Sequence, residues 1–163
     1  MIGILALQGD FFEHEQILDK LGLPHKQVRT LEDTEGLTGF IIPGGESTVM
    51  DLFMKKYGLE EWLKNHAADF PIYGTCAGLI LLARYGLLDV EVERNAYGRQ
   101  SASFMTERGH FIRAPKIKKV GEGVEVLAEE RGVPVLVRQG QVWGSAFHPE
   151  LAGETALHAR IFS

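Results

Sequence analysis

The chain has 163 residues, of which 45% are hydrophobic and 24% are charged, and its formal net charge is −5. These values fit a single globular domain over residues 1–163 and exclude a mainly disordered chain. The longest apolar run, residues 79–83, is much shorter than the roughly 20 residues that cross a bilayer, and the acidic balance is unlike that of a nucleic-acid binder. We therefore expect neither a membrane nor a nucleic acid as partner.

Cysteine usage and the N-terminus indicate the compartment. The chain has one cysteine, Cys76, so no internal disulfide can form. Residues 1–4 lack the basic start of a secretory signal. Both features are typical of a protein in a reducing cytoplasm, which is the localisation we expect. The basic cluster of Lys116, Lys118 and Lys119 is expected to lie in a solvated loop.

The first half of the chain alternates strand patterns with helix patterns. Residues 2–7 form an apolar run punctuated by Gly3, which is typical of a strand buried on both faces. Residues 11–21 mix spaced apolar residues with charges, which predicts an amphipathic helix that Gly22 and Pro24 end. Further strands are predicted at 25–28, 37–42 and 71–73, and helices at 47–57 (capped by Ser47), 59–67 and 77–84.

The second half is predicted to be rich in strands. These strands lie at 87–93, 111–114, 124–127, 133–137 and 142–147, and a closing helix lies at 154–162. The alternation in the first half favours a parallel sheet that helices cover on both faces. We therefore predict an α/β fold with one three-layer domain and a mainly parallel central sheet.

The most informative stretch joins the strand at 71–73 to the helix at 77–84 through Gly74, Cys76 and Gly78. Gly-x-Cys-x-Gly has the form of a nucleophile elbow, in which small flanking residues let backbone segments approach closely. The turn would place Cys76 at a helix N-terminus, which lowers the pKa of a thiol. A lone cysteine is otherwise a small buried hydrophobe, and without a second cysteine no metal site is expected.

Backbone donors for a developing oxyanion are predicted at two places. Residues 43–47 read Pro-Gly-Gly-Glu-Ser between a strand and a helix, where the N–H groups of Gly44 and Gly45 can point inward. The N–H of Ala77, directly after the cysteine, is the other donor. The alternative is a turn without a catalytic role, since Pro-Gly-Gly is common in turns between strands and helices. No phosphate-binding glycine motif is present, so no nucleotide or other cofactor is expected.

Phe-His-Pro-Glu at 147–150 offers the proton acceptor that a cysteine nucleophile needs. Pro149 favours an extended backbone at His148, and side chains two apart in an extended segment face the same side. Glu150 can then orient the imidazole. On its own, His148 would equally fit a structural histidine. Three other histidines are expected on solvated helix faces: His14, His66 and His158.

Together these motifs resemble the class I, triad-type glutamine amidotransferases. Within that family they resemble the vitamin B6 branch, the glutaminase subunits of pyridoxal 5′-phosphate synthase. The resemblance rests on segments spread over nearly the whole chain: 5–9, 43–48, 74–80, 93–100, 111–115 and 147–151. The chain departs from the family pattern in being short after Arg84 and between Phe104 and Phe111.

The resemblance implies a flavodoxin-like fold and the hydrolysis of L-glutamine to glutamate and ammonia. Cys76 would carry a glutamyl thioester, and His148 and Glu150 would complete a catalytic triad. The ammonia would pass to a separate barrel-shaped synthase subunit in a hetero-oligomeric complex, and activity would be low before docking. The implied glutamine-binding residues are Gly45, Glu46, Ser47, Arg94, Ile112 and Arg113. A guanidinium suits a substrate carboxylate, although surface arginines are otherwise simply solvated.

Three alternatives remain open. A cysteine hydrolase of the peptidase or deglycase type shares the fold, but such relatives place a histidine directly after the nucleophile, where this chain has Ala77. A binding module without activity would not need the three triad residues together. A glutaminase of another pathway, such as histidine biosynthesis, is disfavoured by the segments at 93–100 and 111–115.

Overall fold

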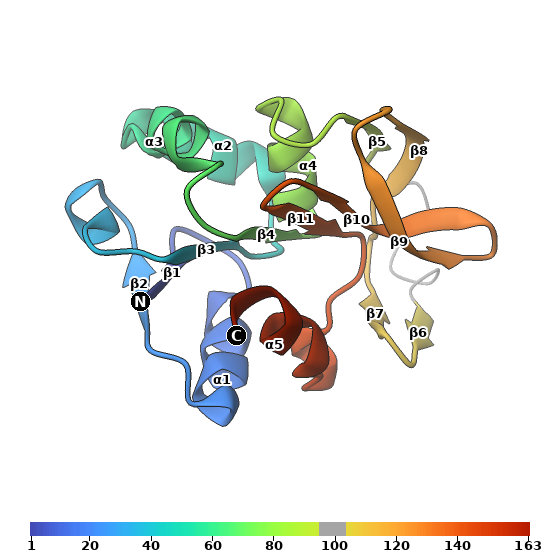
Figure 1. Ribbon diagram of the computed structural model, residues 1–163, viewed down its shortest axis with the longest axis horizontal. Helices are drawn as coiled ribbons and strands as arrows, with labels where there is room; N and C mark the ends of the chain where they lie inside the picture. Colours follow the sequence, from blue (N-terminus) through green and yellow to red (C-terminus); the bar gives the residue numbers. More distant parts are fainter. Residues whose placement is uncertain (95–103) are drawn as a thin grey trace.

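The computed structural model describes residues 1–94 and 104–163, and Figure 1 shows their arrangement. The strands of this part are β1 (Ile2–Leu5), β2 (His25–Val28), β3 (Gly39–Ile42), β4 (Ile72–Thr75), β5 (Val90–Glu93), β6 (Phe104–Thr106), β7 (Gly109–Phe111), β8 (Lys116–Val120), β9 (Glu125–Glu130), β10 (Val133–Gln139) and β11 (Val142–Ser145). The α-helices are α1 (Phe11–Leu21), α2 (Ser47–Lys56), α3 (Leu59–His66), α4 (Ala77–Arg84) and α5 (Ala156–Phe162). Single 3₁₀ turns lie at Glu32–Thr34 and Glu150–Ala152.

Within the described residues the central sheet has seven strands in the order β2-β1-β3-β4-β11-β10-β9. The neighbours from β2 to β11 are parallel, whereas β10 and β9 add antiparallel pairs at one edge. Helices α2, α3 and α4 cover one face, and α1 and α5 cover the other (Figure 1). The predicted α/β fold with a mainly parallel, helix-covered sheet is confirmed. No helix among residues 1–94 and 104–163 is long and apolar enough to cross a membrane.

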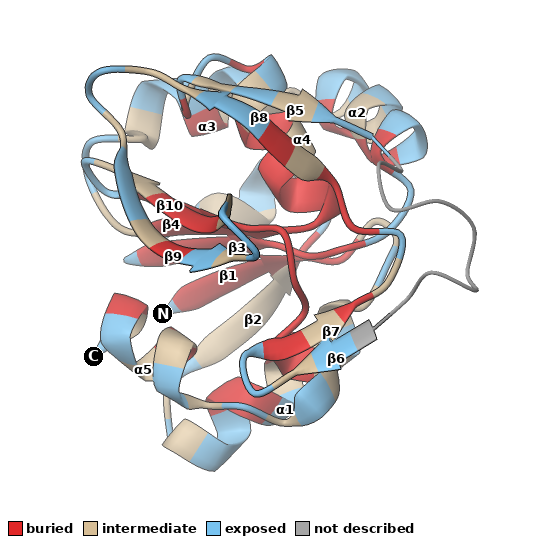
Figure 2. Cartoon of the chain, turned by 90° about the vertical axis from the view of Figure 1, so that its right-hand side faces the viewer, coloured by how far each residue is buried: buried red, intermediate tan, exposed pale blue. Residues whose placement is uncertain are grey.

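The hydrophobic core lies on both faces of this sheet, and its central strands are buried (Figure 2). Successive side chains on a strand point to opposite faces, so Ile41 and Ile42 belong to different clusters. Ile41 packs with Ile4 and with Leu18 of α1, while Ile42 packs with Met50 of α2. The apolar runs in the sequence therefore correspond to strands whose two faces are both buried.

The second half contains strands that the sequence did not reveal. The predicted strand at 111–114 is wrong, because β7 ends at Phe111 and forms a hairpin with β6. The solvated loop expected at the three lysines is also wrong, since they lie in β8, which pairs with β5. Ile117 is the one buried residue of β8. A short surface strand with so few apolar residues lacks the pattern that identified the central strands.

Helix α2 begins in a different way from the prediction. Its N-cap is Glu46 and not Ser47, which is the first helical residue. The Glu46 carboxylate accepts hydrogen bonds from the N–H groups of Thr48 at 3.1 Å and Val49 at 2.9 Å. The Glu46 side chain folds back over the first turn and accepts from two backbone N–H groups that have no partner within the helix. A shorter residue such as Ser or Asp usually has this capping role.

Candidate active site

Cys76 occupies the sharp turn between β4 and α4. Its backbone has φ 50° and ψ −100°, a conformation that a non-glycine residue rarely adopts. A Cβ added to Gly78 would lie 2.2 Å from the carbonyl oxygen of Ile42, and one added to Gly74 would lie 2.6 Å from the backbone of Gly78. Both glycines are therefore required by close backbone approach, as expected for a nucleophile elbow.

His148 reaches the cysteine from the segment that follows β11. Strand β11 lies beside β4 in the sheet, and the N–H of Cys76 donates to the Ser145 carbonyl at 2.8 Å. The His148 backbone is held on its other side by His110, through reciprocal hydrogen bonds of 2.8 and 3.2 Å. The sheet thus brings together two side chains 72 positions apart, and Cys76 is near enough to the imidazole to help raise the pKa of His148.

Glu150 contacts the imidazole as the sequence predicts, but the backbone between them is not extended. Pro149 has φ −66° and ψ −30°, and Glu150 begins a 3₁₀ turn. Within this turn Glu150 Oε1 lies 2.7 Å from His148 Nδ1. His148 itself is extended, in a β-bridge with His110. The expected extension through to Glu150 is wrong, and a tight turn makes the contact instead. Both side chains are buried.

Asp10 is a member of this group that sequence reasoning missed. Its Oδ2 lies 3.0 Å from the same Nδ1 atom of His148. Asp10 follows β1 and is anchored by its N–H, which donates to the Gly44 carbonyl at 3.1 Å. The sequence signal for Asp10 was its position shortly after the first predicted strand. Polar residues just beyond the carboxyl ends of parallel strands line the crevice where ligands bind.

The electrostatics favour a charged imidazole. Burial disfavours the protonated form of His148, but its hydrogen bonds with two carboxylates and the thiol outweigh this effect and raise its pKa to about 12. Burial raises the pKa of Glu150, and the neighbouring imidazolium opposes that shift. Since Nδ1 faces the two carboxylates, Nε2 is left for the thiol of Cys76. This arrangement stabilises the protonated imidazole of His148.

The turn of residues 43–46 forms the opposite wall. A Cβ on Gly44 would lie 2.2 Å from Cε1 of His148, so this glycine lies directly against the imidazole. The N–H of Glu46 donates to Gln8 Oε1 at 2.8 Å. In contrast, the N–H groups of Gly45 and Ala77 donate to no other residue that the structure describes. Two backbone donors beside the thiol are thus available to a ligand.

A cavity of about 330 Å³ opens at Cys76. It brings together Cys76, Ala77 and His148 with every residue that the resemblance assigned to glutamine binding, namely Gly45, Glu46, Ser47, Arg94, Ile112 and Arg113. Asp10, Ile80 and Leu151 complete the lining. Glu150 lies behind His148 and outside the lining. Candidate site residues from distant parts of the chain therefore share one cavity.

Two arginines in the wall differ in their contacts. Arg94 lies 3.3 Å from the Glu46 carboxylate and 3.2 Å from Thr48 Oγ1, so its guanidinium is tied to the start of α2. Hydrogen bonds from the first turn of α2 are the main cause that lowers the pKa of Glu46, and it remains anionic beside Arg94. Arg113 has a positive φ of 46°, another backbone conformation that is rare outside glycine and concentrated at functional sites.

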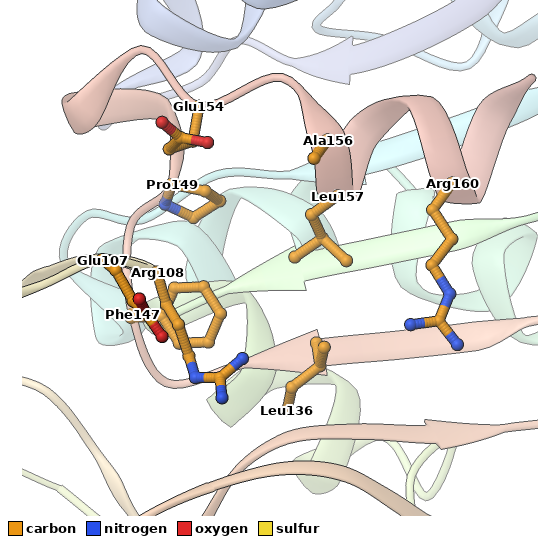
Figure 3. A pocket seen from close by; sticks show the side chains of 9 residues that line it. All are labelled: Glu107, Arg108, Leu136, Phe147, Pro149, Glu154, Ala156, Leu157 and Arg160. Carbon is orange, nitrogen blue, oxygen red and sulfur yellow. The ribbon is translucent and has the colours of Figure 1, made fainter.

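A second cavity, of about 370 Å³, is lined in part by Phe147 and Pro149 (Figure 3). Leu136, Phe147 and Leu157 give it an apolar lining, and Arg108 and Arg160 extend beside it with Glu107 and Glu154 (Figure 3). It contains no cysteine and none of the predicted site residues. Its charges are balanced, so it offers no clear preference for an anion or a cation.

Three side chains that could ligate a metal lie close together at the site. Among the residues that the structure describes, Asp10, His148 and Glu150 form the one group whose ligating atoms all lie within 4.8 Å of one another. Both carboxylates face a single imidazole nitrogen that already has a 2.7 Å contact with Glu150. This geometry orients a histidine, and the expectation that no metal is used stays a prediction.

Two of the histidines expected on solvated faces are in fact fully buried. His14 of α1 and His158 of α5 are 0% exposed and contact each other. His66, on α3, is partly exposed and bonds the carbonyl of Trp62. The prediction for His14 and His158 is wrong because both helices turn these residues towards the sheet, where polar partners replace water.

Comparison with known proteins decides the family. The model of the SNO glutamine amidotransferase family matches residues 4–162. The chain belongs to the SNO glutamine amidotransferase family. A pyridoxal 5′-phosphate synthase subunit PdxT of Thermus thermophilus is 47% identical over 179 residues, covering 97% of this chain and 94% of that protein. A PdxT subunit of Tropheryma whipplei is 46% identical, covering 96% and 94%.

Solved structures agree with this assignment. A crystal structure of a glutamine amidotransferase has a TM-score of 0.92 and 44% identity, with 98% of this chain and 96% of that one covered. The PurLQS structure from Thermotoga maritima shares the fold alone, with a TM-score of 0.72 and 18% identity over 98% of this chain and 95% of that one. The alignment with the Thermus protein is longer than the 163 residues of this SNO family member, in agreement with its short segments.

Proposed function

We propose that this chain hydrolyses L-glutamine to L-glutamate and ammonia, as the glutaminase subunit of a pyridoxal 5′-phosphate synthase. Membership of the SNO family and the names of the PdxT relatives support the reaction and the pathway. The observation that carries the chemistry is the position of His148, which contacts Glu150 through Nδ1 and lines the same cavity as Cys76. A nucleophile, a base and an orienting carboxylate in this order define a triad.

The reaction begins with the shared proton of the Cys76–His148 pair on the imidazole. The Cys76 thiolate attacks the side-chain amide carbon of glutamine. Negative charge then develops on the amide oxygen, where the free N–H groups of Gly45 and Ala77 can donate to it. The intermediate collapses by breaking the C–N bond, and the imidazolium proton goes to the departing ammonia. A glutamyl thioester on Cys76 remains.

Hydrolysis of the thioester returns the site to its first state. Neutral His148 takes a proton from water, the hydroxide attacks the thioester carbon, and the sulfur leaves as thiolate with release of glutamate. Glu150 and Asp10 hold the imidazole through both steps. Glu46, Ser47 and Ile112 bind the substrate along the cavity wall, and Arg94 and Arg113 suit the carboxylate of glutamine.

The ammonia is a substrate for a second subunit. That partner is the barrel-shaped synthase subunit, which assembles pyridoxal 5′-phosphate from a pentose phosphate and a triose phosphate, and docking on it raises glutaminase activity. We place the complex in the cytoplasm, in keeping with the free thiol of Cys76. No cofactor, metal, membrane or nucleic acid takes part in the proposed reaction.

Ammonia release from glutamine, measured with and without the candidate synthase subunit, tests this proposal. We expect release to depend on Cys76 and to increase when the synthase is added. A Cys76→Ala variant that releases ammonia as fast as the wild type in the complex would show that the chain is only a binding module. Cleavage of peptides without ammonia release from glutamine would favour the peptidase alternative.

A further inference from the structure

Two buried imidazoles lie directly behind the carboxylate of the proposed triad, and the proposed mechanism does not use them. His14 Nδ1 lies 2.8 Å from His158 Nε2. The other nitrogen of His14, Nε2, lies 3.3 Å from Thr75 Oγ1 and 3.6 Å from Glu150 Oε1. The first of these is a hydrogen bond, and the second is an electrostatic contact beyond hydrogen-bond length. His14 thus faces both the residue before Cys76 and the triad carboxylate.

The hydrogen-bond partners decide which nitrogens carry protons. Burial is the main cause that lowers the pKa of His14 and of His158, so both rings are neutral and each carries one N–H. If His158 donates from Nε2, then His14 accepts at Nδ1 and carries its own proton on Nε2. His158 Nδ1 is then a bare lone pair, and it has no hydrogen-bond partner among the described residues.

The opposite tautomers are unfavourable. His14 would then donate from Nδ1, and its Nε2 lone pair would face the Glu150 carboxylate. His158 would also carry its proton on Nδ1, where it would be a buried donor without an acceptor. An unpaired buried N–H costs about 1–3 kcal/mol, and a bare nitrogen lone pair is the milder loss. The arrangement therefore favours a proton on His14 Nε2, which points towards Thr75 and Glu150.

The surroundings hold these rings in place. The ring of Tyr73 packs edge-on against both, with centroid distances of 6.3 Å to His14 and 5.4 Å to His158. The Ser145 hydroxyl donates to the Phe147 carbonyl at 2.9 Å, so the Tyr73 hydroxyl must donate to Ser145 Oγ, at 2.8 Å. This chain of hydrogen bonds fixes the backbone directly before His148. The imidazole pair and the tyrosine thus form one buried support behind the site.

We propose that His14 is a positioning residue, which uses an N–H directed by His158 to hold Glu150 in register with the Cys76 turn. The inference rests on the proposed function. Two side chains far apart in sequence, Thr75 and Glu150, must keep a fixed separation if the imidazole between Glu150 and Cys76 is to stay aligned. His14 contacts both of them from a third element, α1. The charged or titratable groups around Glu150 are His148, Asp10, His14 and Tyr73.

Substitution of His14 tests the proposal in the full chain. His14→Phe keeps a ring but removes the N–H, whereas His14→Gln keeps a donor. We expect His14→Phe to lower kcat for ammonia release in the synthase complex by about 10- to 100-fold with KM unchanged, because a small misplacement costs this much. His14→Gln should recover part of the loss. His66→Phe is the matched control, since it removes a histidine that contacts only α3 and its surroundings.

A second readout works on the chain alone and needs no glutaminase activity. The pH profile of Cys76 alkylation by iodoacetamide reports how well His148 stabilises the thiolate. We expect His14→Phe to shift this profile to higher pH, and His66→Phe to leave it unchanged. If the wild type releases no ammonia even with the synthase, the proposed function fails, while the alkylation profiles still decide the role of His14.

The proposal is overturned if His14→Phe matches His66→Phe in both kcat and alkylation. Circular dichroism shows whether His14→Phe folds. If it does not, Thr75→Val takes its place, because it removes the hydroxyl that accepts the hydrogen bond from His14. A lower kcat and a shifted alkylation profile in Thr75→Val support the proposal, and wild-type values of both contradict it.

Discussion

The Nδ1 atom of His148 lies 2.7 Å from Oε1 of Glu150, and the two residues are separated by a single proline in a tight turn. A second carboxylate, Asp10, lies 3.0 Å from the same nitrogen. The two acids differ in burial: the Glu150 side chain is fully buried, whereas that of Asp10 is 16% exposed. The buried and closer carboxylate should dominate the orientation of the imidazole.

Glu150→Gln and Asp10→Asn separate these two contributions. We expect Glu150→Gln to reduce kcat by about 10²- to 10⁴-fold, as loss of an orienting carboxylate does in related triads. Asp10→Asn should cost less, because its carboxylate is farther away and partly solvated. Both variants should lower the pKa of His148, since each removes a hydrogen bond that raises it. Ammonia release and NMR titration of His148 measure the two effects.

The order of the two variants is the decisive comparison. A larger loss of kcat in Asp10→Asn than in Glu150→Gln would show that Asp10 is the orienting acid and that the assignment of Glu150 is wrong. Glu91→Gln is a suitable control because this glutamate is on the surface strand β5, in an exposed pair with Lys119. It should leave both measurements unchanged.

Gly44→Ala should impair the site through the imidazole. The new Cβ would lie 2.2 Å from Cε1 of His148 and 3.2 Å from Asp10 Oδ1. The imidazole must move, and we expect kcat to fall by about 10-fold or more, because misplaced groups lose rate steeply. Gly123→Ala is the matched control, because its nearest neighbour would be Gln139 Nε2 at 3.7 Å. Equal kcat values in the two variants would contradict the contact between Gly44 and His148.

Gly78→Ala should act on stability. Its Cβ would lie 2.2 Å from the Ile42 carbonyl oxygen, which belongs to the backbone of a central strand and cannot rotate away. We expect the free energy of unfolding to fall by about 1–3 kcal/mol or more, as in overpacked cores. Urea titration measures this loss. A wild-type midpoint would mean that α4 does not approach β3 as closely as the geometry requires.

The buried imidazole of His158 should make stability sensitive to acid. Burial lowers its pKa to about 4, below the value of about 6.5 in an unfolded chain. Between these values the unfolded state binds the extra proton, so this group lowers stability as the pH falls, by about 3 kcal/mol in total. Glu150 acts in the opposite direction, because burial raises its pKa above the unfolded value.

Comparison with His158→Gln isolates the histidine from the carboxylate. Urea titrations at pH 7 and pH 4 should show that the wild type loses about 3 kcal/mol more stability than the variant does. The same loss in both proteins would mean that His158 is not buried in its neutral form. His25→Gln is a control at a partly exposed histidine of β2.

The parts of the fold that the sequence predicted are those with strong apolar patterns. The central strands are buried on both faces, and helices α1, α3 and α4 have regularly spaced apolar residues. The positions of these elements therefore agree with the prediction. The β6–β7 hairpin and β8 were not predicted, because each of these strands has only three to five residues and its hydrophobic pattern is weak.

The candidate site was predictable where a motif constrains the backbone. The glycines around Cys76 and the His-Pro-Glu segment could be identified from their spacing alone. His14 and His158 could not, because each takes part only through contacts between elements that are far apart in the chain. A histidine on an amphipathic helix has no local feature that shows whether it faces water or a buried carboxylate.

Covalent labelling of the nucleophile tests the central claim most directly. The chain, with and without the synthase subunit, is incubated with a chloroketone analogue of glutamine, and the adduct is mapped by mass spectrometry. We expect one adduct, on Cys76, whose formation excess glutamine suppresses and Glu150→Gln slows. Labelling at another residue, or none on Cys76 in the complex, would contradict it.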